Sequence, residues 1–456
     1  MKDRLRAYLK NTARQKGRTI SVGLIGYGTT SEAMLEVLSQ ADAVGEITVR
    51  HNRKMHNVPP DAVRLICGEG AFRDIYEDLL FTSPSVRREA LKMPSGTELT
   101  SDTDIFFSER RKNTFLVSGS DGKSTVTTIT SLLLSPTFPT LFTGGNLGRP
   151  VALASLNSEA FLLELSSFNL RYTEPKAKRS LLTNVTPNHL DWHSDLDEYE
   201  ECKARLIRAA DEPILPLSCP FNESLARDTD SFALVSDTLT DRELRKLYKT
   251  LHTVTVKGGY IAIDDVPILK VERIKRSEKH NVQNFMSATA LTIGYTDKYR
   301  IREVAESFSG LEHRCESFTL LGKEYINSSI DTTPERTRAT ITSLARPVHL
   351  ILGGRGKGLS YDAMRAPILE YARSISVYGD AADEITEWLE GDSELAHIPY
   401  RCFATFLEAT DHADASASPC GTVLLSPAAT AYGEFKSFAE RGELFKSYLT
   451  KKHSNI

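Results

Sequence analysis

The feature that most constrains this chain is an apolar stretch that runs into a glycine-rich turn and then into a second apolar stretch. Residues 114–117 (T-F-L-V) are typical of a strand, and residues 126–134 are typical of the start of a helix. The turn between them reads G-S-D-G-K-S-T over residues 119–125. Backbone N–H groups at a helix N-terminus bind phosphate, the helix dipole favours negative charge, and Lys123 adds a cation. The pattern therefore predicts a phosphate-binding loop.

The spacing of this loop leaves an alternative open. Two residues separate Gly119 from Gly122, whereas the common phosphate-binding loop has four residues between its glycines. A Gly/Ser turn capped by one of its serines, with a surface lysine nearby, would have the same sequence. The strand before the turn and the helix after it favour nucleotide binding, with a hydroxyl of Ser124 or Thr125 available to a phosphate-bound Mg²⁺. The residues expected to contact the nucleotide are Gly119, Ser120, Asp121, Gly122, Lys123, Ser124 and Thr125.

Length and composition indicate the broad class. The chain has 456 residues, of which 40% are hydrophobic and 25% charged, as in an ordinary globular protein of two or three domains. A net charge of −4 gives no reason to expect nucleic acid or a membrane surface as a partner. No apolar run approaches the roughly 20 residues of a membrane span. The six cysteines form no C-x-x-C pair, so neither a zinc site nor a disulfide framework is predicted. We expect a cytoplasmic monomer.

The region before the phosphate loop has its own glycine turn. Residues 1–18 are basic, which fits a transit peptide or a solvated N-terminal helix, and we expect the helix. A strand over Ile20–Ile25 leads into G-Y-G-T-T-S and a helix over Glu32–Ser39, a unit that can hold a diphosphate. Ser31 stands at the third glycine position of the dinucleotide motif, so a purely structural turn is the alternative. A second turn, Ser83–Ser85, ends a later strand.

Glu164 interrupts an otherwise apolar strand pattern over Phe161–Leu165. A buried carboxylate is costly unless it is paired or binds a metal, so we interpret Glu164 as a metal ligand, with an ion-paired structural glutamate as the alternative. The next predicted strand ends in N-H-L-D-W-H over residues 188–193, and open α/β sheets bind ligands at the carboxyl ends of strands. In the helix that follows, over about 195–210, Lys203 alone would be taken for a solvated lysine.

The remainder of the chain continues the alternation of strands and helices. Short strands over residues 231–269 predict a satellite β element, and a helix then opens with Asn281 and Asn284 on one side. From residue 310, strands alternate with helical stretches, which predicts another doubly wound α/β domain. The sequence thus predicts an α/β protein of three domains, over residues 1–108, 109–309 and 310–456.

Eight motifs follow one another in order along the chain. They are G-S-D-G-K-S-T (119–125), G-G-N-L-G (144–148), E-L-S-S-F-N (164–169), N-V-T-P-N-H-L-D (184–191), H-N-V-Q-N (280–284), G-L-E-H-R-C-E (310–316), L-L-S-P-A-A (424–429) and F-K-S-F-A-E-R-G (435–442). Each motif is modest alone. Together, and over essentially the whole chain from about residue 20, they resemble the motifs of the Mur ligases of peptidoglycan synthesis.

The resemblance implies an ATP-dependent amide ligase. A Rossmann-like N-terminal domain would hold a uridine diphosphate, a central P-loop-type ATPase domain would hold ATP and Mg²⁺, and a Rossmann-like C-terminal domain would hold the incoming amino acid. The motifs are most similar to those of the members that add D-glutamate to UDP-N-acetylmuramoyl-L-alanine (UDP-MurNAc-L-Ala). The γ-phosphate would pass to the substrate carboxylate, and the amine would attack the acyl phosphate. The implied partners are small molecules only.

The resemblance also implies roles for single residues. Transfer from ATP to a carboxylate gathers several anions, and Lys123 would stabilise the phosphoryl group in transit. Lys203 would be carbamylated, which turns a cation into an anionic metal ligand. The catalytic residues would be Lys123, His189, Lys203 and Arg314, and the Mg²⁺ ligands Ser124, Glu164, His189 and Lys203. Asn281, Asn284 and Arg314 would also contact ATP. The substrates would be bound by Gly26, Gly28, Thr29, Ser83, Asn146, Ser167, Thr332, Arg336, Lys357 and Phe438.

Three positions depart from the family pattern. Ser328 replaces an aspartate associated with ATP, Ile330 a lysine that binds the glutamate carboxylate, and Ala431 a serine that contacts the amino acid. An unpaired buried carboxylate costs several kcal/mol, so we predict that Arg336 replaces the missing lysine. Two alternatives follow: a ligase of the same fold for another amino acid or acceptor, such as a folylpolyglutamate synthase, and a catalytically silent nucleotide-binding relative. The uridine-binding type of domain before Gly119 argues against the folate ligase.

Overall fold

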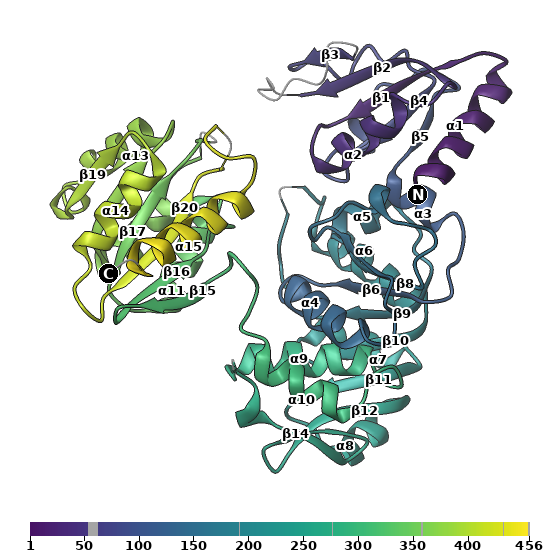
Figure 1. Ribbon diagram of the computed structural model, residues 1–456. Coiled ribbons are helices and arrows are strands. Elements are labelled where there is room, and N and C mark those ends of the chain that lie inside the picture. Colours follow the sequence, from purple (N-terminus) through teal and green to yellow (C-terminus); the bar gives the residue numbers. More distant parts are fainter. Residues whose placement is uncertain (53–62, 191, 276, 357–358, 432, 455–456) are drawn as a thin grey trace. The chain divides into compact units, whose positions relative to one another are not determined.

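The computed structural model describes residues 1–456 except 53–62, 191, 276, 357–358, 432 and 455–456 (Figure 1). The chain divides into two compact units, Met1–Phe308 and Ser309–Ile456. The first unit contains a five-stranded and a nine-stranded sheet, and the second contains a six-stranded sheet. Each sheet is built mainly of parallel strands joined through helices, which confirms the predicted α/β class. The division into three functional domains stays a prediction.

The first sheet has five parallel strands in the order β3-β2-β1-β4-β5. The apolar run before the G-Y-G turn is its central strand, since a strand covered on both faces is apolar throughout. The strands are β1 (Ile20–Ile25), β2 (Val44–His51), β3 (Arg64–Cys67), β4 (Leu79–Thr82) and β5 (Glu98–Thr100). The helices are α1 (Lys2–Lys16), α2 (Thr29–Leu38) and α3 (Asp102–Phe107), with a short 3-10 turn at Arg88–Ala90.

The N-terminal helix α1 is confirmed, but the expectation that it is solvated is wrong for one of its faces. Leu5, Leu9 and Thr12 are buried, and residues spaced by three and four lie on the same side of a helix. The hydroxyls of Tyr8 and Thr12 donate to the carboxylate of Glu98 at the start of β5. The basic side chains occupy the remaining faces. The helix is therefore part of the core of the first unit.

The second sheet has the order β14-β13-β12-β11-β10-β9-β6-β8-β7. Its strands are β6 (Thr114–Ser118), β7 (Leu141–Gly145), β8 (Ala160–Glu164), β9 (Ala177–Leu182), β10 (Ala210–Pro216), β11 (Ser231–Ser236), β12 (Thr250–Lys257), β13 (Tyr260–Ile263) and β14 (Val266–Lys270). The β12–β13 and β13–β14 pairs are antiparallel, and the other pairs of this sheet are parallel. The satellite β element predicted over residues 231–269 corresponds to β11–β14, which continue the main sheet.

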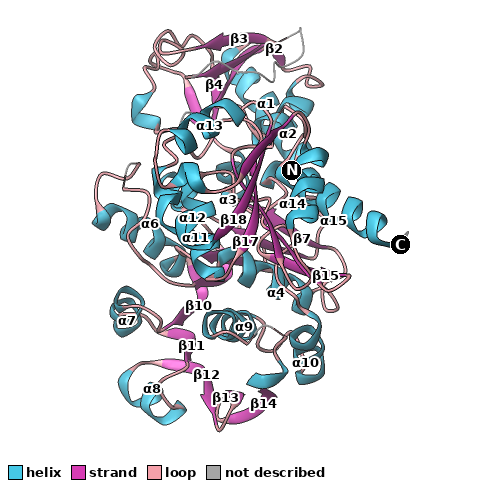
Figure 2. Ribbon diagram, turned by 90° about the vertical axis from the view of Figure 1, so that its left-hand side faces the viewer, coloured by secondary structure: helices cyan, strands magenta, loops and turns pink. Residues whose placement is uncertain are grey.

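Helices cover both faces of this second sheet. They are α4 (Lys123–Leu134), α5 (Ser167–Tyr172), α6 (Leu196–Arg208), α7 (Pro220–Arg227), α8 (Asp241–Leu247), α9 (Lys279–Leu291) and α10 (Lys298–Ser307), with 3-10 turns at Val151–Leu153 and Val271–Arg273. Beside β10–β12, helices α7 and α8 lie on one side and α9 and α10 on the other (Figure 2). Helix α9 also packs against α4, which follows the phosphate loop.

The second unit is a mixed sheet in the order β15-β16-β20-β17-β18-β19, in which only the β15–β16 pair is antiparallel. The strands are β15 (Glu316–Leu320), β16 (Lys323–Asn327), β17 (Val348–Gly353), β18 (Ala372–Tyr378), β19 (Tyr400–Phe403) and β20 (Thr422–Ala428). The helices are α11 (Pro334–Leu344), α12 (Arg365–Tyr371), α13 (Ala382–Glu390), α14 (Phe406–Ser416) and α15 (Phe438–Ser454), with 3-10 turns at Asp362–Met364 and Leu395–His397. Among the helices that the structure describes, none has the length and apolar character needed to cross a bilayer.

The docking of α1 predicts a specific stability effect. Leu9 is fully buried, so Leu9→Ala should lower the free energy of unfolding by about 2–5 kcal/mol. The neighbouring exposed residue supplies the control, and Lys10→Ala should stay within about 0.5 kcal/mol of the parent. Urea denaturation followed by circular dichroism measures both. Equal stability of the two variants would mean that α1 does not pack on the core.

Candidate active site

Three predicted site segments meet at the carboxyl edge of the second sheet. The phosphate loop (residues 119–125) follows β6, which lies between β8 and β9. Glu164 ends β8, and the loop that contains His189 follows β9. Because these strands are parallel, their C-terminal ends lie at one edge of the sheet. The structure therefore brings together three segments that are separate along the chain, at residues 119–125, 164 and 189.

The phosphate loop lacks the serine cap that the structural alternative requires, and its binding of phosphate stays a prediction. Gly122 is the N-cap of α4, and no side chain caps that helix. The first backbone N–H groups of α4 therefore donate no hydrogen bond to an N-cap side chain. Gly119 has φ of 147° and Gly122 has φ of 76°, in the region that favours glycine. A Cβ atom on Gly119 would lie 1.8 Å from Thr183 Oγ1, and one on Gly122 would lie 2.3 Å from Asn284 Oδ1. Glycine is therefore required at both positions.

Hydrogen bonds from β9 and α6 fix the shape of the phosphate loop. The N–H of Ser120 donates to Asn184 O at 2.8 Å, and the N–H of Asp121 donates to Asn184 Oδ1 at 2.9 Å. The hydroxyl of Thr183 donates to Asp121 O at 2.6 Å. The hydroxyls of Ser120 and Tyr199 share a hydrogen bond of 2.8 Å. The loop is thus held in shape by neighbouring elements of the protein itself.

Two lysines meet the backbone of the loop. Lys123 Nζ donates to the carbonyls of Gly119 at 2.9 Å and Ser120 at 2.8 Å, and Lys203 Nζ donates to Gly119 O at 2.7 Å. Lys203 is only 2% exposed, so the interpretation of a solvated lysine that its helix alone suggests is wrong. Burial, and next the Lys123 cation, hold the pKa of Lys203 well below its usual range. The neutral amine that this favours is a nucleophile.

Glu164 is 1% exposed, and its two carboxylate oxygens have different surroundings. Oε1 accepts a hydrogen bond from Asn146 Nδ2 at 2.8 Å. Oε2 is buried and has no hydrogen-bond partner among the described residues. A buried carboxylate oxygen without a donor is costly, and a cation bound there would remove the cost. The ion pair that the structural alternative requires is not found among the described residues, and the arrangement fits a hard divalent ion.

His189 lies on the exposed loop after β9. Its φ is 55°, an uncommon conformation for a residue with a side chain, and its ring contacts that of Phe168 edge-on at 4.9 Å. Among the described residues, no three His, Cys, Asp or Glu side chains gather closely enough to hold a metal alone. A magnesium ion needs few protein carboxylates, since it keeps waters and binds substrate phosphates. Glu164 and His189, with the Ser124 hydroxyl in the first turn of α4, are suited to such a shared site.

A pocket of about 770 Å³, partly open to solvent, lies within the first unit beside these loops. Ser83 and Asn146 line it, as do Ser166 and Phe168 of the segment after Glu164. The Ser83 N–H donates to Ile25 O at 2.8 Å, so this turn lies beside the end of β1. The predicted contacts Gly26, Gly28 and Thr29 follow that strand, and Gly28 is the N-cap of α2. Ser167 is turned away from the pocket, toward His193, and its substrate contact stays a prediction.

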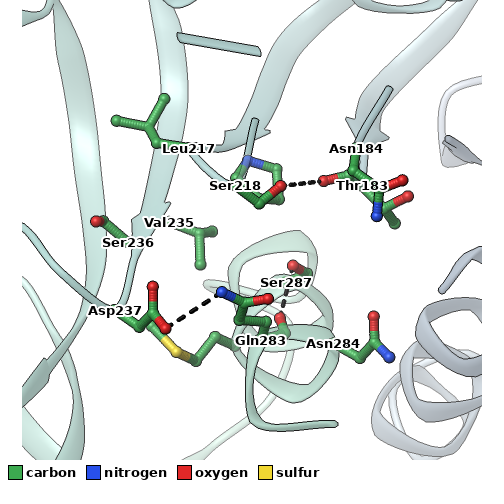
Figure 3. A pocket seen from close by; sticks show the side chains of 12 residues that line it. Thr183, Asn184, Leu217, Ser218, Val235, Ser236, Asp237, Gln283, Asn284 and Ser287 are labelled. Carbon is green, nitrogen blue, oxygen red and sulfur yellow. Dashed lines mark hydrogen bonds between the residues drawn. The ribbon is translucent and has the colours of Figure 1, made fainter. Parts of the chain in front are cut away.

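A second pocket lies beside the phosphate loop, at the carboxyl ends of β9, β10 and β11 (Figure 3). It has a volume of about 380 Å³, part of it open to solvent. Asn184, which binds the phosphate loop, and Asn284, which lies against Gly122, both line it. Gln283 extends across its floor and donates to Asp237 Oδ2 at 3.2 Å. Asn281 instead lines a separate small cavity with Thr125.

The remaining predicted site residues belong to the second unit. Arg314 is exposed, and Phe438, the first residue of α15, is 38% exposed. Arg336 is exposed on the first turn of α11, and its Nη1 donates to Ile330 O at 3.2 Å. Thr332 lies in the loop between β16 and α11. Lys357 lies outside the described residues.

The sequence did not assign a role to several residues that shape the site. Asn184 begins the N-V-T-P-N-H-L-D motif and Thr183 precedes it, but the sequence does not show that both bind the phosphate loop through hydrogen bonds. Arg441 of α15 is fully buried and donates to oxygens of Ser329, Ala429 and Tyr378 rather than to a carboxylate of the described residues. It stands in the F-K-S-F-A-E-R-G motif, whose composition alone suggests a charged helix surface.

The geometry of the phosphate loop predicts the effect of one added methyl group. Gly119→Ala would place Cβ against Thr183 and strain a backbone at φ 147°, at about 1–3 kcal/mol. We expect the affinity for ATP, measured by calorimetry, to fall at least about tenfold. Gly258→Ala is the matched control, because Gly258 also has positive φ (55°) but nothing within 4 Å of its Cβ position. Equal ATP affinity of the two variants would contradict the loop assignment.

Comparison with known proteins agrees with this site. Residues 117–292, which include the phosphate loop, Glu164, His189 and Lys203, match the Mur ligase middle domain. The UDP-N-acetylmuramoylalanine–D-glutamate ligase of Ruminiclostridium cellulolyticum is 32% identical over 393 residues, covering 82% of each chain. The ligase of the same name from Acetivibrio thermocellus is 30% identical over 472 residues, covering 96% of this chain and 98% of its own.

Solved structures support the fold. The chain is similar to the UDP-N-acetylmuramate–alanine ligase MurC of Thermotoga maritima, with a TM-score of 0.55 and 15% identity over 95% of this chain and 100% of that one. MurF of Acinetobacter baumannii gives a TM-score of 0.51 and 14% identity over 94% of this chain and 90% of its own. At these identities the likeness concerns the fold alone. From the motifs, the site and the similarity over most of its length, this chain belongs to the Mur ligase family.

Proposed function

We propose that this protein joins D-glutamate to UDP-MurNAc-L-Ala in peptidoglycan synthesis, with conversion of ATP to ADP and phosphate. The observation that carries the proposal is the group of Lys123, Glu164 and Lys203 at one sheet edge, in a chain similar over 96% of its length to a D-glutamate ligase. A catalytically silent relative has no need for the unpartnered buried oxygen of Glu164. Because ATP and the nucleotide-sugar are intracellular small molecules, we also propose a cytoplasmic location. That the protein is a monomer stays a prediction.

The chemistry proceeds in two steps. An oxygen of the alanine carboxylate attacks the γ-phosphorus, the bond to the bridging oxygen of ADP breaks, and an acyl phosphate forms. The nitrogen of D-glutamate then attacks the acyl carbon, loses a proton, and phosphate leaves with the former carboxylate oxygen. Lys123 would turn from the carbonyls of Gly119 and Ser120 to the γ-phosphate, where negative charge gathers. Mg²⁺, held by Glu164, His189 and Ser124, would draw charge from the phosphate oxygens.

Lys203 supplies a further ligand in this proposal. Its neutral amine adds to the carbon of CO₂ and releases one proton, which gives a carbamate whose single negative charge is shared by two oxygens. The low pKa that burial and Lys123 impose supports this, because only the unprotonated amine reacts. The amine already lies 2.7 Å from the carbonyl of Gly119 in the phosphate loop. A carbamate there would approach both the cation of Lys123 and a bound metal.

The amino acid would bind at the carboxyl edge of the third sheet. Arg336 holds the carbonyl of Ile330, the position that lacks the family lysine, so its guanidinium is anchored where a side-chain carboxylate has to be paired. Thr332 and Phe438, with Lys357, complete the predicted contacts. Nucleotide contacts from Arg314, and the base pocket at Asn184 and Asn284, are likewise part of the proposal.

The test of the function is phosphate release in the presence of ATP and Mg²⁺. We expect fast release only when UDP-MurNAc-L-Ala and D-glutamate are both present. A higher rate with another amino acid would replace the proposed substrate, a higher rate with a folate acceptor would replace the proposed acceptor, and no release with any of them would favour a silent relative.

Removal of the loop cation should abolish turnover. Lys123→Ala should lower kcat at least about 10²-fold, because the γ-phosphate loses its main cation in the transition state. Lys298→Ala is the matched control. Lys298 is also the first residue of a helix, but it is exposed and belongs to α10 and not to the helix that follows the phosphate loop. Near-normal turnover of the Lys123 variant would mean that the loop does not hold the transferring phosphate.

The carbamate makes a separate prediction. Lys203→Ala should be nearly inactive and partly rescued by formate or acetate, whose oxygens replace those of the carbamate. The parent enzyme should lose activity in buffers depleted of CO₂ and regain it on addition of bicarbonate. Full activity without CO₂ would leave Lys203 as an unmodified buried amine.

The role of Arg336 is tested by substrate choice. Arg336→Ala should lower kcat/KM for D-glutamate at least about tenfold, because a charge-assisted pair is lost. Arg338→Ala, which removes a second exposed arginine of α11, should leave kcat/KM near the parent value. An unchanged value for D-glutamate in Arg336→Ala would show that another group pairs the carboxylate.

A further inference from the structure

The two proposed metal-binding residues come from different loops. Glu164 ends β8, whereas His189 follows β9, and β6 lies between these strands in the sheet. Strand pairing alone does not fix the distance between two loops beyond the ends of strands that are not neighbours. A metal site needs its ligands held to within a fraction of an ångström, so some contact between the loops has to hold them in place.

A buried histidine makes that contact. Ser167 lies three residues after Glu164, and His193 lies four residues after His189. His193 is 2% exposed, and its Nε2 lies 3.0 Å from Ser167 Oγ. The N–H of His193 also donates to His189 O at 2.9 Å, which ties the ring to the backbone of the proposed ligand. One side chain therefore joins both loops.

The orientation of His193 is fixed from its other side. Its Nδ1 lies 3.3 Å from Glu198 Oε2, and Glu198 is paired in turn with Arg171 at 2.7 Å. A carboxylate at Nδ1 assigns the ring proton to that nitrogen, so Nε2 accepts the hydroxyl proton of Ser167. Glu198 is in α6 and Arg171 in α5, so the chain of contacts is anchored in two helices.

The ring of Phe168 supports the same junction. It packs against His189 at 4.9 Å, His193 at 5.9 Å and Trp192 at 4.3 Å. Trp192 Nε1 donates to Ser85 O at 2.9 Å, in the turn after β4 that lines the larger pocket. The segment 192–193 thus contacts the loops of both proposed metal ligands and the turn proposed to bind the nucleotide-sugar.

We propose that His193 is a positioning residue for the metal, which holds Glu164 and His189 in place by fixing Ser167 relative to the loop after β9. The proposal rests on the metal site of the proposed function. A histidine that serves only the stability of the fold would change the free energy of unfolding when replaced, but not the affinity of the folded protein for a metal ion. Metal affinity therefore separates the two roles.

The experiment is binding of Mn²⁺ alone to the full chain, followed by the loss of the free Mn²⁺ signal in electron paramagnetic resonance. His193→Leu should raise the Kd for Mn²⁺ about tenfold or more, as for other residues that orient metal ligands. His193→Gln, whose amide can still contact Ser167, should recover most of the affinity. His349→Leu is the matched control, because His349 makes the same kind of contact, Nδ1 to Ser374 Oγ at 2.8 Å, in the second unit.

Thermal unfolding of each variant shows whether it is folded at the temperature of the titration. If His193→Leu is not, Ser167→Ala removes the same contact with a smaller change and should also raise the Kd. A Kd in folded His193→Leu or Ser167→Ala equal to that of the parent and of His349→Leu would overturn the positioning role. Absence of Mn²⁺ binding by the parent, both alone and in the presence of ATP, would instead overturn the metal site itself.

Discussion

The hydrogen bonds that hold the phosphate loop against the end of β9 are the interaction on which the site depends. Two donors of the loop backbone and one acceptor are satisfied by Asn184 and Thr183, so the loop keeps its shape through contacts with the protein itself. Thr183 fills the space beside Gly119, and Asn284 fills the space beside Gly122, so neither position has room for a side chain. The first N–H groups of α4 are thereby directed to a single point, where a phosphate group would bind.

Ionisable groups are buried in this site at a cost that a bound metal and modification of Lys203 would offset. Lys203 and Glu164 are both almost fully buried, and neither has an ion-pair partner among the described residues. Such groups lower stability in the free protein. A metal at Glu164 would pair the buried carboxylate, and a carbamate on Lys203 would be a further ligand of that metal, so binding would stabilise the folded chain. The site is thus less stable alone than with its ligands, as expected where function rather than folding determines the residues.

Local patterns predicted the fold and the burial of Glu164 in its strand, but not which side chains of the helices are buried. Apolar runs located the strands around Glu164 and the phosphate loop, and α6 (Leu196–Arg208) differs from the predicted helix by only a few residues. The burial of Lys203 was not predictable from its helix, because which face of α6 is covered depends on how the helix packs. The buried face of α1 was not predictable for the same reason. The contact of His193 with Ser167 joins two loops that are separate in the sequence, so no local pattern predicts it. The departures at Ser328 and Ala431 lie at buried positions, where a small side chain fits the packing.

In the proposed reaction, direct transfer of the γ-phosphate activates the carboxylate of the acceptor. The most direct measurement uses UDP-MurNAc-L-Ala labelled with ¹⁸O in the alanine carboxylate, with mass spectrometry of the phosphate released during turnover with D-glutamate. The proposed reaction predicts that each phosphate carries one ¹⁸O atom, because the attacking carboxylate oxygen leaves with the phosphoryl group. Phosphate without ¹⁸O would mean that water attacks ATP, and that no acyl phosphate forms at this site.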